Sequence, residues 1–168
     1  MAYSIEELAS DCHDALSADS EQAGLERVRQ SVARALTDEE FIATHLGPEA
    51  DSPRNILYED PDLGFCIIAH VYEGGANPPP HDHGPTWAVY GQAAGVTEMT
   101  DFKVLKAPSG DSPGKVEAVK THDLHAGDTM VYLTGDVHTP RREEETRLIR
   151  VEGQDLSKIK RDRFELAK

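Results

Sequence analysis

Residues 75–95 read GANPPPHDHGPTWAVYGQAAG, so that His81 and His83 stand one residue apart. Alternate side chains of a β-strand point to the same face, and a His-x-His pair on a strand therefore directs two imidazoles into one interior. The prolines at 78–80 make a stiff entry to this stretch, because proline does not sit inside a central strand. We expect a strand over residues 80–91 that carries two metal-ligating side chains.

A second stretch, residues 127–138, supplies a third histidine. It reads GDTMVYLTGDVH and ends at His138. A third imidazole from a distant strand would complete a set of three neutral nitrogen ligands with open positions on the opposite side of the ion. Such a set suits Fe(II), and also Zn, Ni, Mn or Cu. The two stretches together predict one metal site made of His81, His83 and His138.

The two stretches resemble the paired motifs of the cupins, the double-stranded β-helix proteins. Those motifs are G-x5-H-x-H-x3,4-E-x6-G and G-x5-P-x-G-x2-H-x3-N, and the glycines and histidines of both match without a gap. Ala88 stands in place of the acidic ligand, Leu133 in place of the proline and Arg142 in place of the asparagine. The resemblance implies a mainly β jelly-roll (cupin) barrel with a three-histidine site.

Within the cupins, a three-histidine site is similar to that of the cysteine dioxygenase group, the thiol dioxygenases. These proteins use Fe(II) and insert both atoms of O2 into a thiol sulfur. Their arginine that clamps the substrate carboxylate matches Arg54, which precedes Asn55 at the corresponding distance before the His-Asp-His segment. An arginine fork suits a carboxylate because it donates two parallel hydrogen bonds. The alternative for Arg54 is a surface arginine at the start of a strand.

The remaining catalytic positions depart from that group. Its pocket cysteine falls on Ala88, and its Ser-x-His-x-Tyr run falls on residues 148–152, which read LIRVE. Glu152 would be a general base if it points into a dry barrel, and a surface charge if it points outward. Tyr132, with Trp87 and Tyr90, would shape the cavity, or would be part of the barrel core.

Length and composition favour one domain of 168 residues with a formal net charge of −14. The acidic excess argues against nucleic acid and acidic membrane surfaces as partners. The sequence holds no apolar run of membrane-spanning length and no signal-peptide pattern at its start, so we expect a cytoplasmic protein. A small-molecule substrate and O2 are the expected partners, and a homodimer stays open.

Hydrophobic periodicity divides the chain into a helical segment (1–48), a β-barrel (50–156) and a C-terminal tail (157–168). Ser4 with Glu7, and Thr37 with Glu40, are expected helix starts. Residues from 155 onward are expected to form a solvated terminal helix. Strands are expected at 54–59, 64–73, 80–91, 95–105, 115–120, 128–133 and 146–152.

The leading hypothesis is an Fe(II)-dependent dioxygenase of the thiol dioxygenase kind, acting on a small carboxylate-bearing molecule that can be a thiol. The second is a non-redox metal cupin: an isomerase, a lyase or a decarboxylase. The third is a cupin that binds a small molecule without turnover. In the first two, Arg54, Glu152 and Tyr132 are the candidate catalytic residues.

Overall fold

The chain begins with helices and continues with strands. The computed structural model describes residues 2–168. Its helices are α1 (Ile5–Ala18), α2 (Gln22–Leu36) and α3 (Glu39–Leu46). Its strands are β1 (Asn55–Glu59), β2 (Cys66–Tyr72), β3 (Ala88–Ala94), β4 (Thr97–Lys106), β5 (Gly114–Leu124), β6 (Thr129–Tyr132), β7 (Val137–Arg141), β8 (Thr146–Glu152) and β9 (Phe164–Leu166), with a 3-10 helix, η1 (Leu156–Lys158), before β9.

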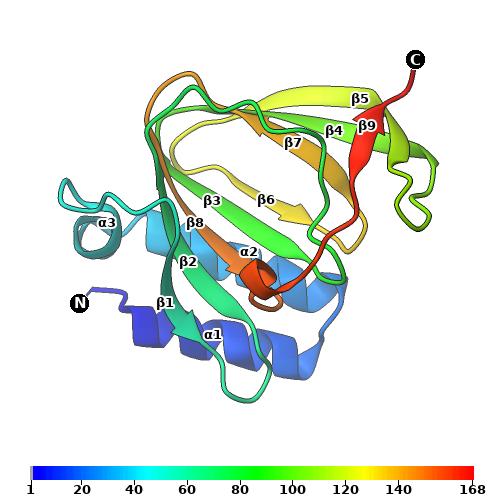
Figure 1. Cartoon of the computed structure of the whole chain (residues 1–168). Coiled ribbons are helices and arrows are strands. Elements are labelled where there is room, and N and C mark those ends of the chain that lie inside the picture. The colour runs from blue at the N-terminus through cyan, green and yellow to red at the C-terminus, as the bar shows by residue number, and fades with distance from the viewer. Residues whose placement is uncertain (1) are drawn as a thin grey trace.

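The strands form two sheets, in the orders β1-β2-β8-β3-β6 and β7-β4-β5-β9. Residues 76–81 extend the second sheet, because Ala76 pairs with Arg142 and His81 pairs with His138 on the free side of β7. The barrel then consists of two four-stranded layers. One has the order β2-β8-β3-β6, and the other has the order 76–81-β7-β4-β5. Successive strands therefore cross repeatedly from one sheet to the other, which is the jelly-roll arrangement. The expected mainly β jelly roll after N-terminal helices is confirmed in outline (Figure 1).

The helices cover the outer face of the sheet that contains β3 and β8 (Figure 1). α2 lies so close to β3 that a Cβ on Gly91 would come within 2.4 Å of Val32 Cγ1. Leu8, Val28 and Val32 are fully buried in this layer. The apolar stripes expected in the helices therefore form the core between helices and sheet, and a second apolar cluster fills the barrel.

Helix starts follow the expected chemistry at one position and differ at another. Ser4 and Glu7 form the reciprocal capping box of α1. α3, however, is capped by Asp38, whose carboxylate accepts from the Phe41 N–H at 2.9 Å. Thr37 is instead the C-cap of α2, and its hydroxyl donates to the Arg34 carbonyl. Both threonine and aspartate can cap a helix, and Asp38 does so here because it directly precedes Glu39, the first residue of α3.

Three expectations about secondary structure were wrong. The strand expected over 80–91 begins only at Ala88, because Gly84, with a φ of 61°, and Pro85 form a turn just before it. β7 was not expected, although it carries His138. The expected terminal helix is replaced by η1 and β9, because Phe164 packs with Val116 and Val137 in a small apolar cluster and pulls the tail against β5.

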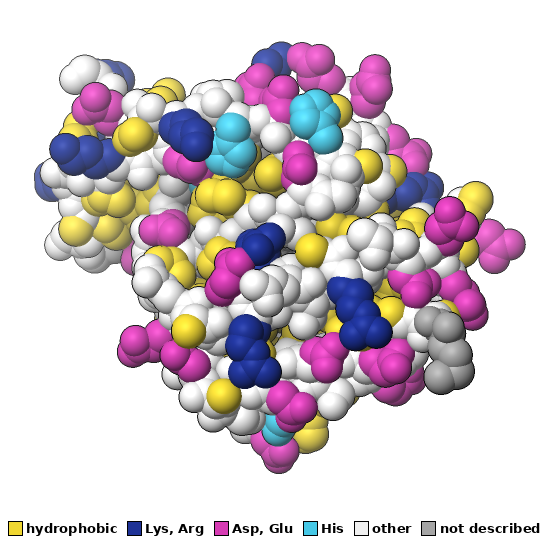
Figure 2. All heavy atoms as spheres, turned by 180° about the vertical axis from the view of Figure 1, so that it is seen from behind, with side chains coloured by type: hydrophobic (Ala, Val, Ile, Leu, Met, Phe, Trp, Pro, Cys, Tyr) yellow, Lys and Arg dark blue, Asp and Glu magenta, His cyan; other side chains and the backbone are white. Residues whose placement is uncertain are grey.

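No helix among residues 2–168 is both long enough and apolar enough to cross a membrane. Figure 2, which shows the molecule from behind the view of Figure 1, has acidic side chains scattered over the visible face. This distribution agrees with the acidic net charge of the chain.

His13 of α1 and Asp60, in the turn after β1, join the helices to the sheet. His13 Nδ1 lies 3.0 Å from Asp60 Oδ1. Asp62 is close enough to complete a three-residue group, but the Asp60 oxygens already accept from Tyr58 and from the N–H groups of Asp62 and Leu63. We therefore interpret the contact between His13 and Asp60 as one that links α1 to the sheet, and not as a metal site.

The His13–Asp60 pair should make stability depend on pH. Its hydrogen bond to Asp60 raises the pKa of His13 above the ordinary value. The stabilisation is therefore fully present below about pH 6.5, the unfolded value, and is lost as pH rises through the folded pKa. His13→Ala should lower the urea midpoint at about pH 6 and much less at about pH 9, whereas His125→Ala should do neither. An equal loss at both pH values would contradict a charged pair.

Candidate metal centre

Three histidines from two separated stretches of chain meet inside the barrel. The backbones of His81 and His138 hydrogen-bond to each other in both directions, each N–H to the other's carbonyl at 2.9 Å. His83 follows two residues after His81. One nitrogen of each ring lies within 4.8 Å of the others, close enough for a single ion to touch all three. Backbone pairing thus brings together the residues that the sequence separates by more than fifty positions.

Hydrogen bonds to backbone carbonyls orient two of the rings. Nδ1 of His81 lies 3.1 Å from the Pro79 carbonyl, and Nδ1 of His138 lies 3.1 Å from the Asp136 carbonyl. A carbonyl can only accept, so each Nδ1 carries the proton and each Nε2 keeps its lone pair for an ion. In His83, Nδ1 is buried without a partner. These residues fit a bound metal, because one nitrogen of each ring lies close to the others and no carboxylate competes for them.

Burial keeps the imidazoles neutral. Desolvation lowers the pKa of His81 to about 4 and that of His138 to about 2. Desolvation, followed by the neighbouring His138, also lowers the pKa of His83 far below its usual range. A neutral imidazole has its lone pair available, so a cation can bind without displacing a proton.

Tyr90 on β3 places a phenolic oxygen against the same nitrogens. Its Oη is 3.0 Å from His83 Nε2 and 3.3 Å from His138 Nε2. Arg150 on β8 lies 3.3 Å from the same oxygen. Ala88, which stands where an acidic ligand is expected in cupins, faces the barrel two residues earlier on the same strand face and is fully buried. An oxygen is therefore present near the histidines even though the carboxylate is missing.

Tyr132 and Trp87 were expected to shape the substrate cavity, but neither lines the cavity that opens beside His81. The Tyr132 ring stacks on His138, with centroids 3.9 Å apart, and its hydroxyl donates to Asp101. Tyr132 therefore packs against the His138 imidazole and helps to fix the orientation of that ring. Trp87 packs against the core on the helix side, because it alternates with the barrel-facing Ala88.

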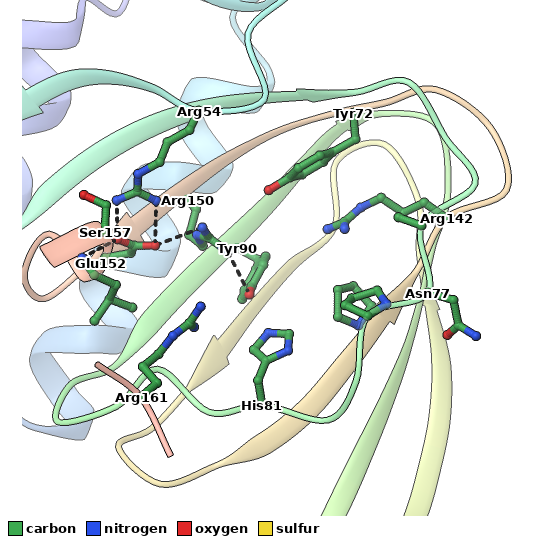
Figure 3. A pocket seen from close by; sticks show the side chains of 14 residues that line it. Arg54, Tyr72, Asn77, His81, Tyr90, Arg142, Arg150, Glu152, Ser157 and Arg161 are labelled. Atoms are coloured by element: carbon green, nitrogen blue, oxygen red, sulfur yellow. Dashed lines mark hydrogen bonds and ion pairs between the residues drawn. The ribbon is translucent and has the colours of Figure 1, made fainter. Parts of the chain in front are cut away.

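A cavity of about 660 Å³ opens beside His81. In Figure 3 the side chains of Tyr72, His81, Arg142 and Arg161 point toward its centre. Charged and aromatic side chains make up much of its lining. Four of them are arginines and one is a glutamate, while Tyr72 and Tyr90 provide aromatic surface. The arginines are Arg54, Arg142, Arg150 and Arg161. The cavity is large enough for a small molecule and is strongly cationic.

Arg54 and Glu152 both lie in this cavity, but they are engaged with each other. Arg54 Nη2 is 3.0 Å from Glu152 Oε2 and 3.0 Å from Asp155 Oδ1. Arg150 adds a third contact, 2.9 Å from Glu152 Oε1. Glu152 is 1% exposed. The guanidinium expected to clamp a substrate carboxylate thus already holds two protein carboxylates, and the expected general base is held between two guanidiniums.

Among the charged and aromatic residues of the cavity, three were not predicted from the sequence: Tyr72, Arg142 and Arg161. Arg142 stands where the cupin motif has an asparagine, and a charged residue at that position is the signal that could have indicated a role. Arg161 lies beyond the expected barrel, and Tyr72 ends a strand whose alternation is hidden because both faces are buried.

Family models and curated proteins give no match to this chain. Solved structures do. A Streptococcus pyogenes protein of unknown function is 19% identical with a TM-score of 0.40, covering 54% of this chain and 65% of that one. A cupin-2 domain protein from Shewanella frigidimarina is 17% identical with a TM-score of 0.45, covering 70% and 95%. The DMSP lyase DddQ from Ruegeria pomeroyi is 17% identical with a TM-score of 0.43, covering 58% and 42%.

The contacts of Glu152 predict that it is a buried counter-ion. Glu152→Gln removes the negative charge and leaves Arg54 and Arg150 facing each other, which should cost about 2–4 kcal/mol of the free energy of unfolding in urea. Glu145→Gln removes an exposed carboxylate paired with Arg147 and should cost less than about 1 kcal/mol. A Glu152→Gln protein of unchanged stability that has lost its activity would instead identify Glu152 as a reacting group.

Proposed function

We propose that the protein is a metal-dependent enzyme of the cupin type that binds one divalent ion on His81, His83 and His138. The observation that carries this proposal is the convergence of three neutral imidazoles beside a cavity of small-molecule size. Three protein ligands leave positions on the ion for other molecules, which is typical of catalytic rather than structural sites. A structural ion would be enclosed by four ligands.

We further propose Fe(II) as the ion and an oxygen-dependent reaction, with Zn, Ni, Mn or Cu as the other metals that the ligands suit. Support comes from the three-histidine set without a carboxylate, which resembles that of thiol dioxygenases. The metal, when bound, would supply the redox and Lewis-acid chemistry. The protein's part is to hold the substrate, exclude water and orient the rings.

Around the site, the resemblance to thiol dioxygenases ends. The positions of the family's Ser-x-His-x-Tyr run are Leu148, Arg150 and Glu152, and of these the two charged residues line the cavity while Leu148 is buried in the barrel core. Arg150 instead directs the Tyr90 hydroxyl toward the histidines. With the carboxylate clamp position occupied by protein contacts, we infer that cysteine itself is a poor substrate.

One observation favours a second candidate, a non-redox lyase, isomerase or decarboxylase. The Tyr90 hydroxyl lies beside the histidine nitrogens and within reach of Arg150. A phenol next to a guanidinium can hold or release a proton at its oxygen, which such reactions require. Tyr90→Phe would then abolish turnover while leaving the metal bound.

Oxygen uptake separates the candidates. Protein loaded with Fe(II) under nitrogen should consume O2 with at least one small anionic thiol or carboxylate, and should do so slowly or not at all with cysteine. His83→Ala should abolish both metal binding and uptake, and His125→Ala, at an exposed histidine, should change neither. Rapid oxidation of cysteine to its sulfinic acid would show that the missing polar triad is unimportant. Turnover of a substrate under nitrogen would favour the non-redox candidate, and tight binding without turnover would favour a binding protein.

A further inference from the structure

Arg142 is held rigidly with its side chain in the cavity. Its backbone N–H and carbonyl both bond to Ala76 at 2.9 Å. The residue is 5% exposed, and its guanidinium carbon lies 4.3 Å from the centre of the Tyr72 ring. Figure 3 shows this guanidinium pointing toward the interior of the cavity, on the side opposite Arg54.

The Arg142 guanidinium has no acidic or hydrogen-bonding partner among residues 2–168. It forms no ion pair with any described carboxylate, and its Nε is buried without a partner. Burial without a counter-ion lowers the pKa of Arg142. Removing a guanidinium from water without pairing it costs free energy, and stacking on one aromatic ring recovers only part of that cost.

The cavity as a whole has more positive than negative side chains. Arg54 and Arg150 are matched by Glu152 and Asp155. Arg161 reaches only a backbone carbonyl, that of Asp82 at 3.1 Å. Two guanidiniums are thus unmatched by a carboxylate in the described part of a chain whose net charge is −14. Acidic residues are abundant in this protein but are missing beside Arg142.

We propose that Arg142 is an anion-binding residue that anchors an oxyanion group of a small dianionic substrate, a dicarboxylate or a phosphate monoester. The guanidinium fork offers two parallel hydrogen bonds to such a group, and Tyr72 holds its plane. Arg161 balances the second negative charge. The rest of the substrate then lies toward His81, and this part of the inference rests on the proposed metal site.

A purely structural role for Arg142 makes the opposite prediction for stability. If the guanidinium only stacks on Tyr72, its removal should destabilise the fold. If it awaits an anion, Arg142→Met should unfold at the same or a higher temperature than the unmodified protein without ligand, because an unpaired buried charge is replaced by an apolar side chain of similar length.

Thermal unfolding of the metal-free protein tests the proposal. Succinate and inorganic phosphate are the dianionic probes, acetate is the monoanionic one, and chloride keeps the ionic strength constant. A saturating dianion should raise the Tm by about 5 °C or more. Arg142→Met should abolish the rise, and Arg142→Lys should weaken binding about tenfold because it loses the fork. Arg141→Met removes the adjacent exposed arginine and should keep the rise.

The outcomes separate this inference from the proposed function. A rise with succinate alone identifies a dicarboxylate, and a rise with phosphate alone identifies a phosphate ester. The inference is wrong if neither probe raises the Tm, if Arg142→Met responds as the unmodified protein does, if acetate is equally effective, or if Arg142→Met is markedly less stable without ligand. Because the assay contains no metal, the anion can raise the Tm even if the protein binds no metal. Equally, the protein can bind a metal even if no anion raises the Tm.

Discussion

The reciprocal backbone hydrogen bonds between His81 and His138 are the contact on which both the barrel and the site depend. They attach the proline-rich segment to the edge of β7 and so complete the second sheet. The same pair sets two imidazoles side by side. A protein that lost this pairing would lose the segment that extends the second sheet, together with the placement of two of the three candidate metal-binding histidines.

Electrostatics then determines what the interior can do. His81 on one wall and guanidiniums on the others leave a strongly cationic cavity, beside the three neutral imidazoles that we propose as metal ligands. Glu152 keeps this arrangement stable because a single buried carboxylate faces Arg54 and Arg150. The protein thus offsets two of its four cavity arginines with its own carboxylates, and the remaining two are available to a ligand.

Much of the fold and the three histidines that meet in the barrel could be predicted because their signals are local. The spacing of glycines and histidines located His81, His83 and His138, although His81 and His83 precede β3 rather than lying in a strand, and apolar periodicity located the helices. The extended but irregular segment before β3 could not be predicted as such, since prolines permit extension without a ladder. Phe164 was missed because one aromatic residue in a polar tail gives no periodic signal.

The roles of charged residues were harder to predict, because they depend on partners distant in sequence. Arg54 was expected to bind a substrate carboxylate, but residues nearly one hundred positions later occupy it. Arg142 received no role, and its lack of a partner is visible only when the whole cavity is assembled. Pairing across a barrel is set by topology, which single motifs do not encode.

X-ray absorption spectroscopy of protein loaded with one equivalent of Fe(II) or Zn(II) tests the central claim most directly. The account predicts one ion per chain with three imidazole nitrogens at about 2.0–2.2 Å and only light atoms completing the shell. Fewer than three imidazoles in the spectrum, or a sulfur at about 2.3 Å from one of the buried cysteines, would contradict a centre built on His81, His83 and His138.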